Sequence, residues 1–225
     1  MTTEEGPWAA AAEGQPDWSA ATRHLSGRDP VLRALIGRVG PCTLAPRPNV
    51  FGTLVGAIVA QQISAAAARS IHKRLWALTR GQPPRPRDIL KRRETTLRRV
   101  GLSRQKIAYL RDLASRVESG ALDLRGLETM GDDAVRAALT AVKGIGNWTA
   151  DMHLIFTQNR PDVFAPGDAA VLFAMRDLYG LPEDAPPSEY VRISDGWRPF
   201  RSIGVWYMYE HIHALRAARR LAAGT

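Results

Sequence analysis

Cysteine is nearly absent from this sequence. Cys42 is its one cysteine, so a disulfide within the chain is impossible and a cluster held by four cysteines is excluded. Apolar runs that approach the roughly 20 residues of a membrane span are also missing. The first residues, Met1–Gly6, do not begin a signal peptide. We therefore expect no iron–sulfur cluster, no membrane association and a cytoplasmic protein.

Acidic residues are the minority among the charged ones. The 225 residues include 31 Lys and Arg against 22 Asp and Glu, which gives a formal net charge of +9. A basic excess suits a polyanionic partner, but it does not distinguish DNA from RNA or from an acidic lipid surface. The length is sufficient for a buried core in one domain, or in one domain with two lobes.

The period-two alternation that marks strands is missing as well. Apolar residues recur instead at spacings of three and four, as at Val31, Leu35 and Val39, which predicts amphipathic helices. The fold class is therefore all-α. The other helices that we expect cover residues 51–60, 65–78, 104–119, 132–141, 147–158, 169–179, 188–196 and 199–222.

The first 25 residues show no sustained periodicity and mix Gly, Pro and Ala with acidic residues. Such a composition is typical of a segment without a core of its own. We predict a flexible N-terminal arm over residues 1–25 and a helical domain over residues 26–225.

The most informative segment is Leu139–Met152. The glycines of Gly144-Ile145-Gly146 flank one apolar residue, which allows a sharp turn with open N–H groups between two helices. A phosphate binds readily there, because a helix N-terminus carries partial positive charge. The segment predicts a hairpin that grips a nucleic-acid backbone through Gly144, Ile145 and Gly146, with the Thr149 hydroxyl as a further donor. Taken alone, a Gly-x-Gly triplet is also compatible with a helix end and a plain turn.

A carboxylate follows the hairpin after the length of a helix and a loop. Asp168 lies 22 residues beyond Gly146. Cleavage of an N-glycosidic bond passes through an oxocarbenium-like state, which a carboxylate stabilises while it orients or deprotonates the attacking water. A DNA-gripping hairpin with such a group nearby indicates chemistry on DNA. The position of Asp168 near a helix start equally suits a helix cap, and the two roles are compatible.

Four segments in a fixed order carry a family resemblance. They are Ile58–Ser64, Leu102–Ile107, the hairpin with Asp168, and Trp197–Ser202 with the Trp-Tyr pair that follows. Together they resemble the helix-hairpin-helix-GPD superfamily of DNA glycosylases and, within it, the 3-methyladenine DNA glycosylase II family of alkylation-repair enzymes. The resemblance implies a two-lobed all-α fold with the active site between the lobes. We expect the N-terminal β-rich domain of many bacterial members to be absent.

The resemblance also assigns roles in base removal. It makes Asp168 the catalytic residue. An aromatic pocket would hold a cationic alkylated base face-on, although each aromatic could instead pack between helices. The pocket positions are Trp148, Tyr209, Met152 and Trp206.

A turn between two helices is expected to enter the duplex. Reaching a base requires flipping it from the stack, and a side chain normally fills the gap. The wedge turn comprises Gln61, Gln62, Ile63 and Ser64. Gln62 matches the intercalating position of the resembled family, and we expect Gln61 to brace the loop backbone.

Two further features of the family concern the hairpin. Relatives that also cut the strand use a lysine two residues after the second glycine, and Trp148 stands at that position here. We therefore predict a monofunctional enzyme that leaves an abasic site. Hairpins of the family hold a monovalent cation, Na⁺ or K⁺, on backbone carbonyls; those of Thr140, Val142 and Ile145 match. No other cofactor is expected.

The predicted function is base excision from duplex DNA that contains alkylated bases, by a monomer. One alternative is a related glycosylase for oxidised or mismatched bases, against which Trp148 and the scarcity of cysteine argue. The other is a non-catalytic DNA-binding module, which would need neither Asp168 nor an aromatic pocket. A basic run over residues 85–99 either follows phosphates or is a solvated face.

Overall fold

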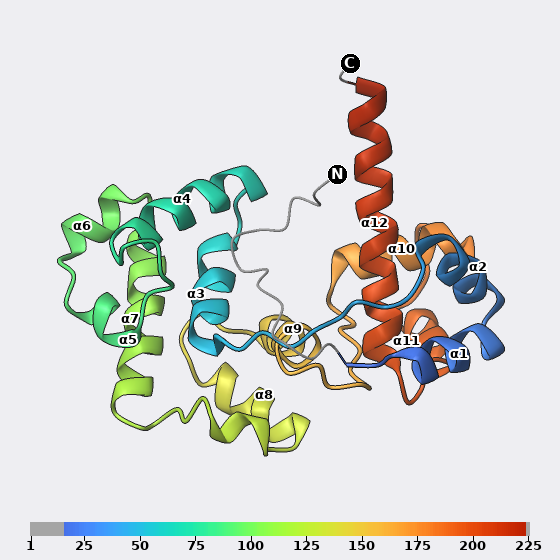
Figure 1. The fold of residues 1–225 in the computed structure, drawn as a ribbon, viewed down its shortest axis with the longest axis horizontal. Helices are drawn as coiled ribbons and strands as arrows, with labels where there is room; N and C mark the ends of the chain where they lie inside the picture. The colour runs from blue at the N-terminus through green and yellow to red at the C-terminus, as the bar shows by residue number, and fades with distance from the viewer. Residues whose placement is uncertain (1–15, 224–225) are drawn as a thin grey trace. The chain divides into compact units, whose positions relative to one another are not determined.

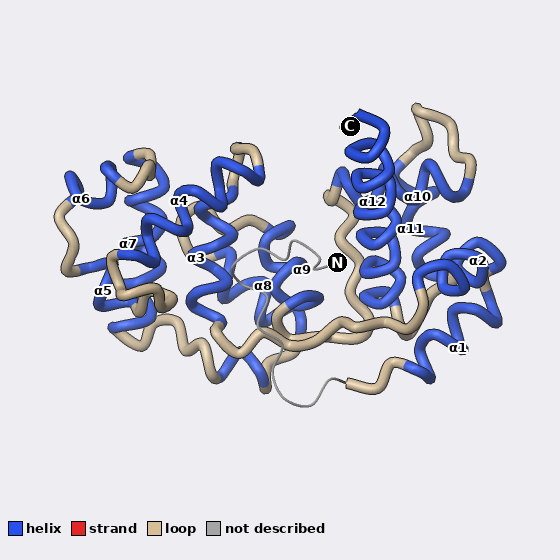
Figure 2. Tube along the Cα trace, turned by 45° about the horizontal axis from the view of Figure 1, so that its top comes forward, coloured by secondary structure: helices blue, strands red, loops and turns tan. Residues whose placement is uncertain are grey.

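The computed structural model describes residues 16–223, which fall into two compact units. Unit 1 comprises residues 46–158, and unit 2 comprises residues 16–45 and 159–223. Every regular element within the described range is a helix (Figures 1 and 2), which confirms the all-α prediction. None of these helices has both the length and the apolar character needed to cross a bilayer.

Unit 1 is built around α3, most of whose residues are buried and which packs against α4, α7 and α9 (Figure 1). Side-chain caps fix where its helices begin: Ser64 accepts from the N–H of Ala67, and Ser103 from that of Lys106. Both serines are therefore N-caps of the helices that follow them. The elements of unit 1 are α3 (Val50–Ala60), α4 (Ala65–Ala77), α5 (Pro86–Leu90), α6 (Glu94–Arg99), α7 (Arg104–Glu118), η1 (Gly126–Glu128), α8 (Asp132–Thr140) and α9 (Asn147–Phe156).

Unit 2 packs α2 and α10 against the long helix α12. Trp197 is its largest fully buried side chain, and its indole N–H donates to Asp29 at 3.1 Å and to the Tyr179 hydroxyl at 3.2 Å. The polar edge of the indole is thus satisfied inside the core. The elements of unit 2 are α1 (Ser19–Arg28), α2 (Pro30–Val39), α10 (Ala169–Tyr179), α11 (Pro187–Asp195) and α12 (Arg201–Ala223).

The predicted flexible arm is wrong at its C-terminal end. Residues 19–25 belong to α1, where Ala21 and Leu25 are buried, and the indole N–H of Trp18 donates to the Leu44 carbonyl at 2.7 Å. Two apolar side chains four residues apart are too sparse a pattern to predict a helix, and packing on the rest of unit 2 supplies the missing stability. Residues 1–15 of the arm lie outside the described residues.

A buried histidine in unit 1 makes the stability of that unit sensitive to acid. His153 on α9 is 3% exposed, and neither nitrogen of its imidazole has a hydrogen-bond partner within residues 16–223; burial lowers its pKa from 6.5 to about 4. The unfolded chain binds the proton more readily. The neutral imidazole of His153 therefore contributes fully to the free energy of unfolding above pH 6.5, and this contribution declines as the pH falls from 6.5 towards 4.

We expect His153→Phe to remove this part of the acid sensitivity. Urea unfolding of the wild type should lose about 2 kcal/mol through this residue between pH 7.5 and pH 5, and the variant should not. His72, whose pKa burial also lowers to about 4, retains its own contribution in both proteins. If the free energy of unfolding falls equally in the wild type and the variant between pH 7.5 and pH 5, the prediction is wrong.

Candidate functional site

The predicted hairpin joins α8 and α9 within unit 1. The backbone of Gly144 has a φ of +82°, and the N–H of Ile145 donates to the Val142 carbonyl at 3.1 Å. Gly146 is the N-cap of α9, which has no side-chain cap and no acidic residue in its first turn. The N-terminus of α9 therefore offers its partial positive charge to an anion.

The two hairpin glycines are required for different reasons. A Cβ placed on Gly144 would lie 2.1 Å from the ring of Tyr109, and the positive φ already favours glycine there. A Cβ on Gly146 would meet no described atom within 4 Å, and its φ of −104° is open to any residue. The packing of unit 1 demands glycine at position 144 alone. At position 146, glycine leaves an open space beside the N-terminus of α9 that a bound anion could enter.

Three contacts hold the hairpin in place. The ring of Tyr109 on α7 covers Gly144, and Asp112 on the same helix accepts the N–H of Lys143 at 2.9 Å. The amide of Gln61 donates to the carbonyl of Gly144 at 2.7 Å. Gln61 thus reaches the hairpin backbone rather than the backbone of its own turn. The sequence did not single out Tyr109 or Asp112, and no local pattern marks them.

An ion pair ties α8 to α9 below the turn. Nε of Arg136 lies 2.8 Å from Oδ1 of Asp151. Burial raises the pKa of Asp151, and the guanidinium opposes that rise. The pair fixes the angle between the two helices of the hairpin, so the N-terminus of α9 is held by both main-chain and side-chain contacts.

The predicted wedge turn projects from unit 1. Gln62 is exposed and has a φ of +55°, a conformation that costs a residue other than glycine free energy. Ile63 is 36% exposed, whereas Ser64 is used as the cap of α4. Gln62 and Trp148 line one cavity of about 420 Å³ in unit 1, together with Gly144. The structure therefore brings the wedge, the hairpin and one pocket aromatic together.

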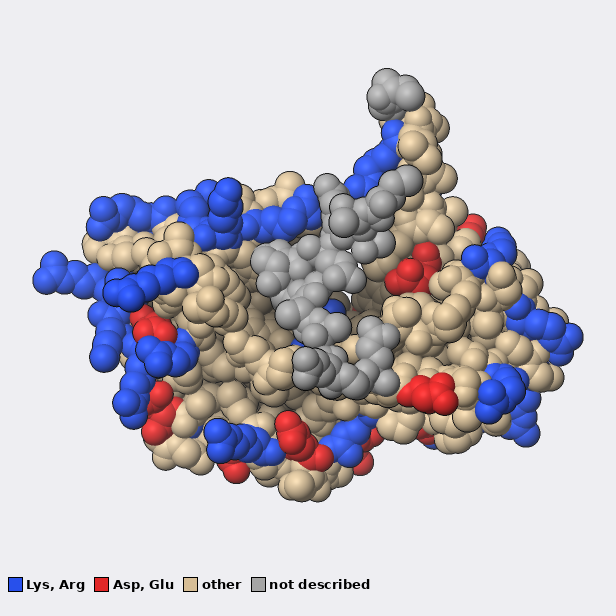
Figure 3. All heavy atoms as spheres, viewed as in Figure 1, with Lys and Arg blue, Asp and Glu red and all other residues tan. Residues whose placement is uncertain are grey.

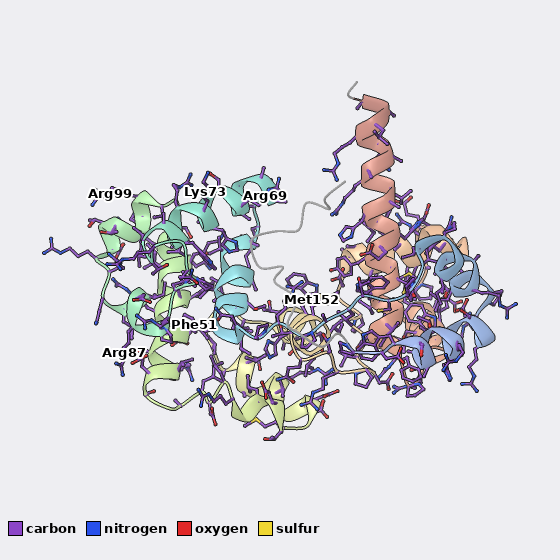
Figure 4. All side chains as sticks on the ribbon, in the orientation of Figure 1. Phe51, Arg69, Lys73, Arg87, Arg99 and Met152 are labelled. Carbon is purple, nitrogen blue, oxygen red and sulfur yellow. The ribbon has the colours of Figure 1, made fainter. Side chains whose placement is uncertain are left out.

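The predicted pocket residues differ in exposure. On α9, Trp148 is 45% exposed. Met152 on the same helix, which is labelled in Figure 4, is half-buried. Thr149, for which the sequence predicts a phosphate contact, is 5% exposed. In unit 2, the half-buried Trp206 meets the ring of Tyr207 edge-on at 4.8 Å, a contact that suits packing within α12.

Asp168 is held by three donors of its own unit. Its Oδ1 accepts the N–H groups of Ala170 and Val171, each at 2.9 Å, so it caps α10. Its Oδ2 accepts the hydroxyl of Tyr209 on α12 at 2.6 Å. Burial and the adjacent carboxylate raise the pKa of Tyr209, so that its hydroxyl keeps the proton it donates. Asp168 is 3% exposed, and these hydrogen bonds fix the positions of both carboxylate oxygens.

The start of α12 positions the segment that leads to Asp168. Nε of Arg201 donates to Asp162 at 2.7 Å, and the Ser202 hydroxyl accepts the N–H of Val163 at 3.0 Å. These contacts give the Arg-Ser pair of the resembled motif a structural role. The segment before the carboxylate is thereby anchored on α12, the helix that also carries Tyr209.

The carbonyls predicted to hold a monovalent cation lie at the hairpin. That of Val142 accepts the N–H of Ile145. Those of Thr140 and Ile145 receive no hydrogen bond from any described residue, which fits oxygen ligands for Na⁺ or K⁺. Within residues 16–223, no group of three His, Cys, Asp or Glu side chains is arranged to hold a metal ion.

Comparison with known sequences gives one family and several relatives. The family described as HhH-GPD superfamily base excision DNA repair protein matches residues 55–199. DNA-3-methyladenine glycosylase 1 of Schizosaccharomyces pombe is 31% identical over 192 residues, which cover 83% of this chain and 84% of that protein.

Solved structures show the same fold. A 3-methyladenine DNA glycosylase of Schizosaccharomyces pombe in complex with abasic DNA aligns with a TM-score of 0.77 and 30% identity, over 85% of this chain and 96% of that one. A DNA-3-methyladenine glycosidase from Bacillus halodurans aligns with a TM-score of 0.77 and 33% identity, over 85% and 88% of the two chains.

Proposed function

The chain belongs to the HhH-GPD superfamily of base excision DNA repair proteins, and we propose that it removes alkylated bases such as 3-methyladenine from duplex DNA. The observation that carries this proposal is the Asp168 carboxylate, buried and held by two main-chain N–H groups and the Tyr209 hydroxyl. The names of the relatives support the substrate class.

The chemistry of the substrate suits one carboxylate. Alkylation of a purine at N3 or N7 makes the base cationic and weakens its glycosidic bond, so the leaving base needs little protonation. Positive charge then spreads over the sugar. Asp168 would stabilise that charge and orient the attacking water. The exposed face of Trp148 would hold the cationic base by a cation–π interaction of about 0.5–2 kcal/mol.

The hairpin and the wedge turn would present the base. The N-terminus of α9 would bind a phosphate across the open space at Gly146. A monovalent cation on the carbonyls of Thr140, Val142 and Ile145 would add a bridge between protein and phosphate. Gln62, already projecting from its turn, would fill the gap that the flipped base leaves.

Product analysis on methylated duplex DNA tests the proposal. We expect wild type to release free 3-methyladenine, to leave the strand uncut at the abasic site, and to form no adduct that borohydride traps, since Trp148 stands where lyases carry lysine. DNA binding without release of any alkylated base would reject the substrate class. A trapped adduct would reject the monofunctional assignment.

The Tyr209 hydroxyl is expected to act through Asp168. Tyr209→Phe removes a hydrogen bond to a charged group, worth about 1.5–3 kcal/mol, and keeps the ring. We expect single-turnover base release to slow about 10-fold or more, with the affinity for abasic duplex unchanged. Weaker binding of alkylated DNA at an unchanged rate would show instead that Tyr209 only lines the base pocket.

A further inference from the structure

Positive charge is concentrated in one stretch of unit 1. Residues 61–111 contain 14 Lys and Arg against two Asp and Glu, a net charge of +12, which exceeds the +9 of the whole chain. Both acids of the stretch already face an arginine: Asp88 lies 3.3 Å from Arg85, and Glu94 lies 4.0 Å from Arg104. The other 12 Lys and Arg side chains of the stretch therefore have no ion-pair partner within it.

Three of these cations form a row. One face of α4 is buried, and Arg69 and Lys73 lie on its exposed face, about 6 Å apart along the axis. Arg74 donates to the Val100 carbonyl at 2.8 Å, which ties α4 to the end of α6, where Arg99 is exposed. We call Arg69, Lys73 and Arg99 the α4 ridge.

The α4 ridge follows an edge of unit 1. Figure 4 labels its three residues along that edge, and Figure 3 shows a band of Lys and Arg there. Within the described part of the chain, none of the three forms an ion pair. Long cations without acidic partners are available to an external anion.

The ridge begins at the wedge turn. Ser64 ends that turn and caps α4, so Arg69 follows it by about 8 Å and Lys73 by about 14 Å along the helix. Phosphates of one DNA strand are about 3.4 Å apart along the duplex axis. The first two cations of the ridge therefore cover about four base pairs, counted from the point at which Gln62 would enter.

We propose that the α4 ridge binds the phosphates of the duplex arm on one side of the flipped base. The inference rests on the proposed function, because it takes the wedge turn as the point of entry. DNA fits this face better than an acidic protein does. No large apolar side chain of α4 is exposed, whereas a protein interface has an apolar core.

Duplexes with unequal arms test the proposal. Each carries a stable abasic-site analogue with about three base pairs on one side and about twelve on the other, in both orientations, so that only one orientation extends past Arg69 to the rest of the ridge. We expect the wild type to prefer one orientation by about 10-fold at 0.1 M salt. The variant R69Q/K73Q/R99Q should lose that preference, and its slope of log affinity against log salt should fall by about 2.7.

A charge-matched variant separates the ridge from general electrostatics. R85Q/R87Q/R125Q removes the same charge from unit 1 and should keep the wild-type preference. Lys73→Gln alone, a milder change, should lower the salt slope by about 0.9. The proposal is contradicted if R69Q/K73Q/R99Q keeps the wild-type preference for one duplex orientation. It is also contradicted if R85Q/R87Q/R125Q loses that preference to the same extent. Failure of the wild type to bind any abasic duplex would overturn the proposed function instead.

Discussion

Asp168→Asn is expected to slow base release by about 10³-fold or more while DNA binding persists. The reason is the charge: a carboxylate stabilises the cationic sugar and directs water, and a neutral amide does neither. Single-turnover release from methylated duplex measures the rate, and the affinity for abasic duplex measures binding. Turnover by the purified variant near the wild-type rate would contradict the catalytic role.

The amide is the informative replacement because Asp168 also caps α10. The side-chain oxygen of asparagine can still accept the N–H groups of Ala170 and Val171, which Oδ1 accepts now. Asp168→Ala removes the cap as well, at a cost of about 1 kcal/mol in stability. A rate loss shared by both variants, with a stability loss confined to the alanine variant, would separate catalysis from capping.

Features specified by neighbouring residues could be predicted from the sequence. The helix starts at residues 65 and 104 and the hairpin at Gly144–Gly146 each depend on a few adjacent positions, and all lie where expected. The short helices α5 and α6 did not emerge, since five or six residues are too few to establish a period. The helix α1 was missed because packing, rather than pattern, stabilises it.

Contacts between distant residues could not be predicted. The hydroxyl of Tyr209 meets an acid 41 residues away, and the amide of Gln61 meets a carbonyl 83 residues away. The sequence placed both side chains in the site and left their partners open, because only the tertiary packing decides them. Tyr109 shows the limit: its role is to cover Gly144, and its own neighbours in sequence give no sign of it.

Gly144→Ala is expected to disrupt the hairpin. The new methyl group would lie 2.1 Å from the ring of Tyr109, on a backbone with a φ of +82°. Strain in the left-handed region and overpacking together should lower the stability of unit 1 by about 3 kcal/mol. DNA affinity should fall at least 10-fold, because the N-terminus of α9 is displaced. Urea unfolding and duplex binding measure the two effects.

Gly146→Ala is the matched control, since the same methyl group meets no described atom there. Its stability should change by less than about 1 kcal/mol, yet its DNA affinity should also fall, because the methyl group occupies the space that a phosphate would enter. Wild-type affinity in this variant would mean that the hairpin does not bind phosphate. Tyr109→Ala completes the comparison: in its background the stability cost of Gly144→Ala should shrink to the backbone strain alone. An unchanged cost would show that the ring is not what excludes a side chain from position 144.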